Sequence, residues 1–198
     1  MPDRLERYRT KRDPDTSPEP GVRADDGARK TRRRRSEPRF VIQKHDASTL
    51  HYDFRLEVDG TLRSWAVPKG PSTDPWERRL AVEVEDHPLE YADFEGVIGA
   101  GYGSGAVIVW DAGTYRNLDE DRSMAEALAA GHAKFWLDGQ KLTGGWTLQR
   151  TRAGAKPKWL LIKRRDEGAD ARRNPQSTQP QSVKTGRTIE QVAQDAAR

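Results

Sequence analysis

Cysteine is absent from the 198-residue chain. Its absence excludes a disulfide framework, a thiolate-held iron–sulfur cluster and a cysteine nucleophile. A metal held by this protein must therefore bind to histidine, aspartate or glutamate side chains, and the chain has only four histidines.

Long hydrophobic runs are also absent. The longest, residues 106–110, has five residues, whereas a membrane-spanning helix needs about 20. Residues 1–10 are too charged for a secretory signal. We therefore expect a soluble intracellular protein with no membrane partner.

Charge and aromatic residues divide the chain into three regions. Residues 1–39 hold 13 Lys and Arg against 8 Asp and Glu, whereas residues 40–165 hold 17 against 18 and contain 14 of the 15 aromatic residues. We expect a folded domain over residues 40–165, because aromatic side chains build cores. Residues 1–39 form a basic arm, and residues 166–198 a polar tail or linker with a short helix from about Thr188.

The arm contains six basic residues among the seven of residues 29–35. Such a run is either a solvated flexible tail or an electrostatic tether for a phosphate backbone. We expect residues 22–38 to be flexible. The excess positive charge makes nucleic acid the first partner to consider.

The central region has the pattern of short β-strands. Residues 50–58 and 61–67 flank Asp59-Gly60, which is a strong hairpin signal. Ser123 and Glu126 form a capping box at the start of one helix. This pattern predicts a mainly β fold, either a small β-barrel or a strongly curved antiparallel sheet, with one or two short helices. The other predicted strands are residues 40–44, 80–84, 106–110, 134–137, 146–150 and 159–163, with a turn at Asp138-Gly139.

One face of the strand at residues 50–58 is polar. Side chains alternate along a strand, so His51, Asp53 and Arg55 share the face opposite the apolar one. His51 and Asp53 could converge on one cation, and Arg55 beside them could bind phosphate. His45 could supply a third ligand. This set suits manganese or zinc equally, and the alternative is three unrelated surface groups.

Two other features of the central region could belong to a site. His87 follows a predicted strand beside carboxylates and is either a general acid or hydrogen-bond donor, or a structural turn residue. Residues 96–105 contain five glycines and are either a flexible loop beside the site or a phosphate cradle. His132 directly follows the predicted helix, and we interpret it as a capping or surface residue.

Four motifs occur in order: FVIQKHDASTLHYDFRLE at residues 40–57, SWAVPKGP at 64–71, VEDHPLEY at 84–91 and FEGVI at 94–98. Together they resemble the 3′-phosphoesterase domain of bacterial DNA ligase D, with the likeness running from about residue 8 to residue 163. The sequence differs from the family pattern at two places. The loop at residues 99–103 is one residue shorter and lacks a glutamate, and Pro14 stands where the family usually has an aromatic residue.

The resemblance implies a manganese-dependent 3′-end-healing enzyme on a small β-barrel. Zn²⁺ or another divalent transition metal is the alternative ion. Such an enzyme removes a 3′-terminal ribonucleoside from a primer strand and then the remaining 3′-phosphate. By position, the resemblance makes His45, His51 and Asp53 the metal ligands, and Arg55 and His87 phosphate contacts. It adds Tyr91, Lys69, Arg79 and Glu85 to the active site, and Arg12, Asp13 and Glu19 from an arm whose residues 8–20 would then be ordered.

The implied partners are DNA or RNA/DNA primer–template 3′ ends, with Ku and a ligase or polymerase as further partners in non-homologous end joining. The implied setting is the cytoplasm of a bacterium or archaeon, at the nucleoid, and nothing in the sequence requires more than a monomer. The alternative function is a non-catalytic DNA-end-binding module that uses the basic arm. A third is a metallophosphoesterase for small molecules.

Overall fold

The computed structural model describes residues 3–22, 37–99 and 101–196. The stretch expected to be flexible, residues 22–38, lies almost entirely outside the described residues. Nine strands make one antiparallel sheet. They are β1 (Arg39–Asp46), β2 (Leu50–Val58), β3 (Thr61–Val67), β4 (Arg78–Glu83), β5 (Gly96–Ile98), β6 (Gly105–Asn117), β7 (His132–Gly139), β8 (Thr143–Arg152) and β9 (Lys158–Lys163).

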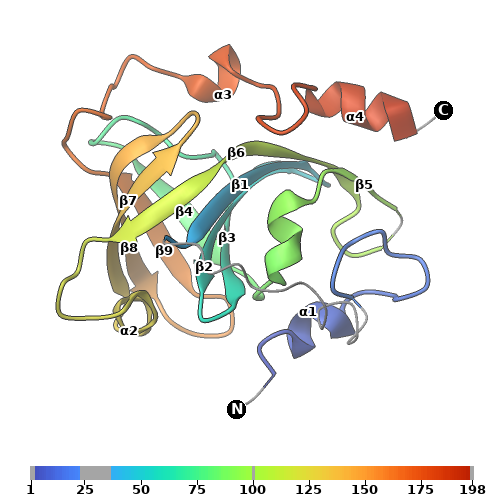
Figure 1. Ribbon diagram of the computed structural model, residues 1–198, viewed down its shortest axis with the longest axis horizontal. Helices are drawn as coiled ribbons and strands as arrows, with labels where there is room; N and C mark the ends of the chain where they lie inside the picture. The colour runs from blue at the N-terminus through green and yellow to red at the C-terminus, as the bar shows by residue number, and fades with distance from the viewer. Residues whose placement is uncertain (1–2, 23–36, 100, 197–198) are drawn as a thin grey trace.

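Eight of these strands close into a barrel (Figure 1). The strand order is β1-β2-β3-β4-β9-β8-β7-β6, and β6 pairs with β1 to complete the circle, while the short β5 extends the sheet beyond β6. Closure leaves these eight strands without a free edge for another chain to pair with. The prediction of a small antiparallel barrel is confirmed.

The barrel interior is filled by alternate residues of each strand. On β2 these are Tyr52, Phe54, Leu56 and Val58, all in the main core cluster. The hairpin after β2 turns at Asp59 (φ 50°) and Gly60 (φ 85°), as predicted for a two-residue turn of this composition.

The second predicted Asp-Gly turn is wrong. Asp138 pairs with Thr143 inside the sheet, and Gly139 pairs with Gly113 on β6. The chain turns two residues later, at residues 140–141, where the buried carboxylate of Asp111 accepts hydrogen bonds from the backbone N–H groups of residues 140–142.

Four α-helices occur in the described residues, where one or two were expected. The two expected helices are present, and Ser123 and Glu126 make the predicted capping box. The two missed helices have only four and five residues, too short to show a helical period in sequence. The helices are α1 (Glu6–Thr10), α2 (Met124–Ala129), α3 (Pro175–Thr178) and α4 (Ile189–Ala196), with a 3₁₀ helix, η1 (Leu89–Asp93).

Both terminal segments pack on the barrel. In the N-terminal segment, residues 3–22, Tyr8 is fully buried against η1 and the outer face of the sheet. In the C-terminal segment, Ile189 and Val192 of α4 pack on β6 (Figure 1), and the carbonyl oxygen of Gln179 accepts from Trp110 Nε1 at 2.9 Å. None of the helices within the described ranges is long and apolar enough to cross a bilayer.

Candidate metal centre and phosphate site

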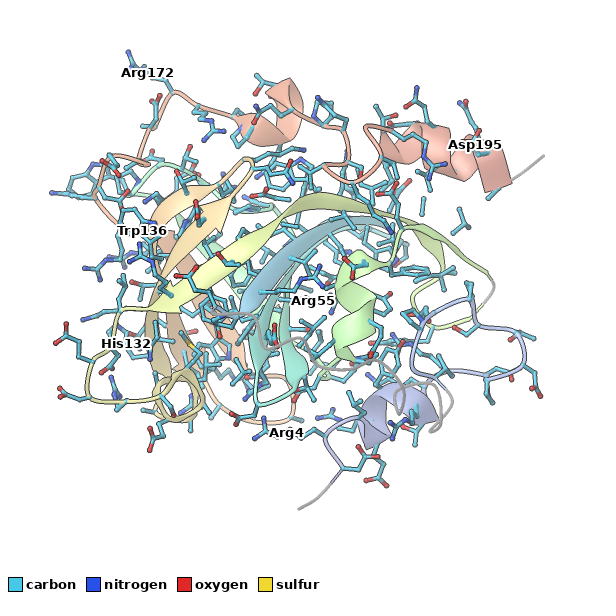
Figure 2. The ribbon with its side chains drawn as sticks, viewed as in Figure 1. Arg4, Arg55, His132, Trp136, Arg172 and Asp195 are labelled. Atoms are coloured by element: carbon cyan, nitrogen blue, oxygen red, sulfur yellow. The ribbon has the colours of Figure 1, made fainter. Side chains whose placement is uncertain are left out.

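The candidate site lies on the outer face of the barrel, where β1, β2 and β3 run side by side. The register places Gln43 opposite Asp53, and His45 opposite His51. Arg55 follows on the same face of β2 and is labelled beside η1 in Figure 2. Although this face points away from the core, Asp53 and Arg55 are only 6% and 2% exposed, because η1 and the N-terminal segment cover it.

Three side chains on this face form a group that could hold a metal ion. One ligand atom from each of His45, His51 and Asp53 lies within 4.8 Å of the others. The Asp53 carboxylate lies between the two imidazoles, with Oδ2 at 3.6 Å from His45 Nδ1 and Oδ1 at 3.5 Å from His51 Nε2. The turn between β1 and β2 brings His45 back across from His51, as the sequence predicted.

Backbone carbonyl groups orient both imidazoles. His45 Nε2 lies 2.8 Å from the oxygen of Gly103, and His51 Nδ1 lies 2.8 Å from the oxygen of Thr49. A carbonyl oxygen can only accept a hydrogen bond, so each ring donates an N–H to its carbonyl group. In a neutral ring the other nitrogen is unprotonated, and its lone pair faces Asp53. Metal-ligating histidines typically donate their other ring N–H to a carbonyl oxygen in this way, so the residues present fit a divalent ion with nitrogen and oxygen ligands.

The Asp53 carboxylate is held ionised. Burial would raise its pKa, but the guanidinium of Arg55, with Nη2 at 3.1 Å, and the two imidazoles hold the pKa well below its usual value. An ionised carboxylate is what a cation ligand requires.

Arg55 is fixed by neighbours on the flanking strands. Its Nε donates to Gln43 Oε1 and its Nη1 to Ser64 Oγ, both at 2.8 Å. Gln43 in turn donates to the carbonyl oxygen of Tyr91 at 2.9 Å. Sequence reasoning missed Gln43 and Ser64, although their positions opposite Asp53 and Arg55 in the register would have indicated them once the strand pairing was known.

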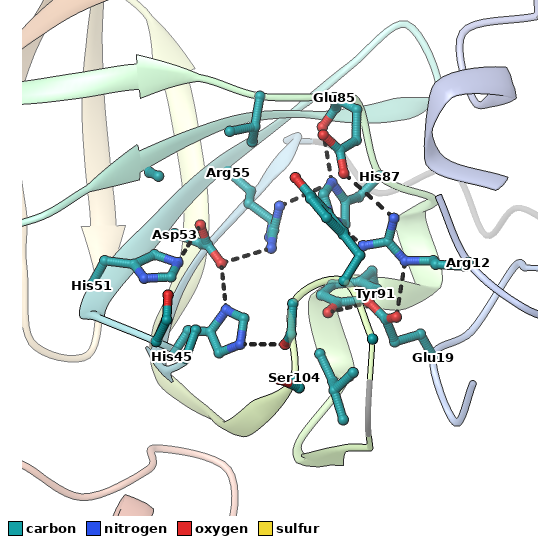
Figure 3. Close-up of a pocket in the computed structure, with 18 residues that line it drawn as sticks. Arg12, Glu19, His45, His51, Asp53, Arg55, Glu85, His87, Tyr91 and Ser104 are labelled. Carbon is teal, nitrogen blue, oxygen red and sulfur yellow. Dashed lines mark hydrogen bonds and ion pairs between the residues drawn. The ribbon is translucent and has the colours of Figure 1, made fainter. Parts of the chain in front are cut away.

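The N-terminal segment completes the site (Figure 3). Arg12 Nε pairs with Glu19 at 2.9 Å, and its Nη1 lies 3.4 Å from Glu85. Tyr91 donates its hydroxyl hydrogen to the other Glu19 oxygen at 2.9 Å. Residues of the N-terminal segment are thereby tied to η1 and to the segment after β4.

His87 is uncharged in this setting. Burial and the guanidinium groups of Arg55 and Arg12 hold its pKa well below the usual value. Its Nδ1 lies 2.9 Å from the carbonyl oxygen of Glu85, which can only accept, so we place the proton on Nδ1. Arg55 Nη1, which has two hydrogens and donates one to Ser64, also lies 3.0 Å from Nδ1. The tautomer is decided by Nε2, because its neighbour Arg12 Nη2 can only donate. Nε2 of His87 is then an acceptor, 3.5 Å from Arg12 Nη2.

Nine of the twelve predicted site residues line one cavity of about 500 Å³. They are Arg12, Glu19, His45, His51, Asp53, Arg55, Glu85, His87 and Tyr91. Of the others, Asp13 is exposed and accepts from the backbone N–H of Asp15, while Lys69 and Arg79 line a separate cavity of about 300 Å³. The glycine-rich loop borders the first cavity with Tyr102, which sequence reasoning did not single out.

The chain is also similar in sequence to known proteins. The sequence pattern of the DNA ligase D 3′-phosphoesterase domain matches residues 43–150. The chain belongs to this family. It is also 50% identical over 189 residues to the multifunctional non-homologous end joining protein LigD of Pseudomonas aeruginosa, and 44% identical over 163 residues to the LigD of Mycobacterium tuberculosis. These matches cover 93% and 80% of this chain but only 22% and 19% of the two relatives, so the chain spans about a fifth of the length of these LigD proteins.

Proposed function

We propose that this member of the phosphoesterase-domain family heals nucleic-acid 3′ ends in a metal-dependent reaction. It removes a terminal ribonucleoside by phosphodiester hydrolysis and then removes the 3′-phosphate. The observation that carries the proposal is the adjacency of the His45, His51 and Asp53 group to the buried Arg55 in one cavity. A cation site beside a fixed guanidinium is suited to a phosphate.

His45, His51 and Asp53 would hold the ion, with Mn²⁺ as the proposed species. When bound, the ion supplies positive charge beside the phosphate and lowers the pKa of the attacking group. The guanidinium of Arg55 is held in position, because its Nε and Nη1 donate hydrogen bonds to Gln43 and Ser64. It therefore presents a preorganised charge to the developing negative oxygens.

Two groups from other elements act beside Arg55, one on the phosphate and one on the attacking group. Arg12 extends from the N-terminal segment and adds a second guanidinium, held by Glu19 and Glu85. The unprotonated Nε2 of His87 accepts a hydrogen bond from the attacking hydroxyl or water and orients it. Tyr91 acts through Glu19, which it holds against Arg12.

The names of the relatives describe proteins of non-homologous end joining. We extend this setting to the chain and propose DNA or RNA/DNA primer–template 3′ ends as its partners, in the cytoplasm and at the nucleoid, with Ku and a ligase or polymerase acting on the same ends. Residues 40–165 would be the phosphoesterase domain, and residues 8–20 would contribute the arm that completes it.

A direct test uses two primer–templates, one ending in a single ribonucleotide and one ending in a 3′-phosphate, incubated with and without Mn²⁺ and resolved on a gel. The proposal predicts metal-dependent shortening of the first to a 3′-phosphate, and loss of phosphate from both. His51→Ala should form neither product. No shortening and no phosphate loss by the unaltered chain would reject the proposal, and end binding that survives His51→Ala without product would favour a non-catalytic end-binding module.

A further inference from the structure

A second cavity of about 310 Å³ borders the candidate site. The two cavities share Val84, Glu85 and Tyr102 in their linings. The far side of the second cavity is formed by Arg7 and Lys11 of the N-terminal segment and by residues 154–157, in the turn between β8 and β9. A ligand that fills the first cavity could therefore continue into the second.

The second cavity is positively charged. Its two carboxylates already have partners, since Glu83 pairs with Arg63 at 2.6 Å and Glu85 pairs with Lys11 at 2.8 Å. Arg7 and Lys156 are exposed, and within the described part of the chain neither forms an ion pair. Unpaired cations at a concave surface favour an anionic ligand, and phosphate is the natural one beside this site.

Tyr102 supplies an aromatic surface at the border of the two cavities. It is 51% exposed, and its hydroxyl accepts from Lys11 Nζ at 3.2 Å. Its neighbours Gly101 (φ 128°) and Gly103 (φ 76°) adopt backbone conformations that favour glycine, and Lys11 Nζ lies 4.4 Å from the ring centroid. An exposed ring beside cations is the usual arrangement for stacking a nucleobase.

We propose that the second cavity holds the nucleotide on the 5′ side of the reacting phosphate. Its backbone phosphate would lie among Arg7, Lys11 and Lys156, and its base would stack on Tyr102. This inference rests on the proposed function. On the 3′ side of the reacting phosphate there is only a terminal nucleoside, which carries no further phosphate, whereas the 5′ side carries one at every nucleotide. A cationic cavity therefore suits the 5′ side.

The assignment has a consequence for the two reaction steps. The nucleotide on the 5′ side remains in place after the terminal nucleoside leaves, so it belongs to both the diester and the monoester substrate. Weakening the second cavity should therefore raise KM equally for both steps. A cavity that held the departing nucleoside would affect the first step alone.

The test begins with binding in the absence of metal, measured by fluorescence anisotropy with a labelled strand ending in a 3′-phosphate. Tyr102→Ala should weaken binding about fivefold or more, since stacking of one base is worth at least that factor, while Tyr102→Phe should bind like the unaltered chain. Arg7→Ala and Lys156→Ala should each weaken binding and lower the salt dependence by about one phosphate contact. Lys134→Ala, an exposed lysine on β7, is the matched control and should change neither.

Measuring KM for both steps with the same variants then decides whether the second cavity holds the nucleotide on the 5′ side of the reacting phosphate or the departing nucleoside. A KM increase confined to removal of the ribonucleoside would overturn the assignment, and so would unchanged binding by Tyr102→Ala and Lys156→Ala. If the unaltered chain forms no product, the proposed function fails, but the metal-free binding measurements still decide whether the second cavity contacts the strand.

Discussion

The two faces of strand β2 are buried in different ways. On the inner face, Phe54 and Leu56 are covered by the apolar core of the barrel. On the outer face, Asp53 and Arg55 are almost as inaccessible, yet they are covered by polar groups that hydrogen-bond to them. Burial alone therefore does not separate core from site, whereas the chemistry of the covering residues does.

The two faces differ because charged side chains lose more free energy on burial than apolar side chains do. An apolar side chain needs only close packing, so the inner face can be filled by any well-shaped neighbours. A buried carboxylate or guanidinium must be paired and fully hydrogen-bonded. The outer face thus requires specific partners, such as Gln43 and Ser64 for Arg55, and this requirement makes it a preorganised site.

The largest effect is expected for Asp53→Asn on the outer face. The substitution removes the charged ligand, so both reaction steps should slow by about 10³-fold or more, measured as product formed with Mn²⁺ present. Glu57→Gln is the matched control, because Glu57 lies on the same face of β2 outside the cavity, and it should stay within a few-fold of normal. Normal turnover by Asp53→Asn would remove the metal assignment.

An inner-face change should affect stability. Phe54 is 1% exposed and its ring stacks 5.7 Å from that of Phe135. Phe54→Ala should lower the free energy of unfolding by about 3–5 kcal/mol, measured by urea denaturation, while the folded protein keeps its affinity for metal. A loss below about 1 kcal/mol would show that the inner face is not the tightly packed region described here.

The contribution of the N-terminal segment can be measured with Arg12→Ala. Removing one guanidinium from the phosphate site should slow both steps by about 10²-fold, with metal affinity unchanged, because Arg12 contacts none of the three ligands. Arg9→Ala, which removes only a pair with Asp3 on the same segment, is the control. Equal losses from both variants would mean that the segment acts only by covering the sheet.

The smallest effect is expected for Tyr91→Phe. The change removes one hydrogen bond, from the hydroxyl to the Glu19 carboxylate, and should lower the free energy of unfolding by about 1.5–3 kcal/mol. Because the ring remains, activity should fall only modestly, through looser positioning of Arg12. A rate loss of 10³-fold with unchanged stability would instead indicate direct contact between Tyr91 and the substrate.

The inner face and the metal group could both be predicted from sequence, because both depend on local spacing. Alternation along residues 50–58 identified the core residues, and the same alternation placed His51, Asp53 and Arg55 together. The turn between His45 and His51 is short enough for their proximity to be inferred.

Local sequence patterns could not predict the supports of the site, which came only from the family resemblance, because these supports depend on pairing between distant segments. Arg12 and Glu85 are 73 positions apart, and no local pattern indicates that they meet. Lys69 lies beyond the end of β3, and the path of the chain there takes it to a separate cavity with Arg79. Similarly, the polar composition of residues 166–198 gave no sign that Gln179 would accept from the indole of Trp110.

The outer face of β1 and β2 is proposed above to be a metal centre. Mn²⁺ titration of the metal-free chain, followed by electron paramagnetic resonance and calorimetry, tests it most directly. We expect one tightly bound ion per chain, lost in His45→Ala, in His51→Ala and in Asp53→Asn, and kept in Glu57→Gln. Stoichiometric binding that survives all three ligand substitutions, or no binding by the unaltered chain, would contradict it.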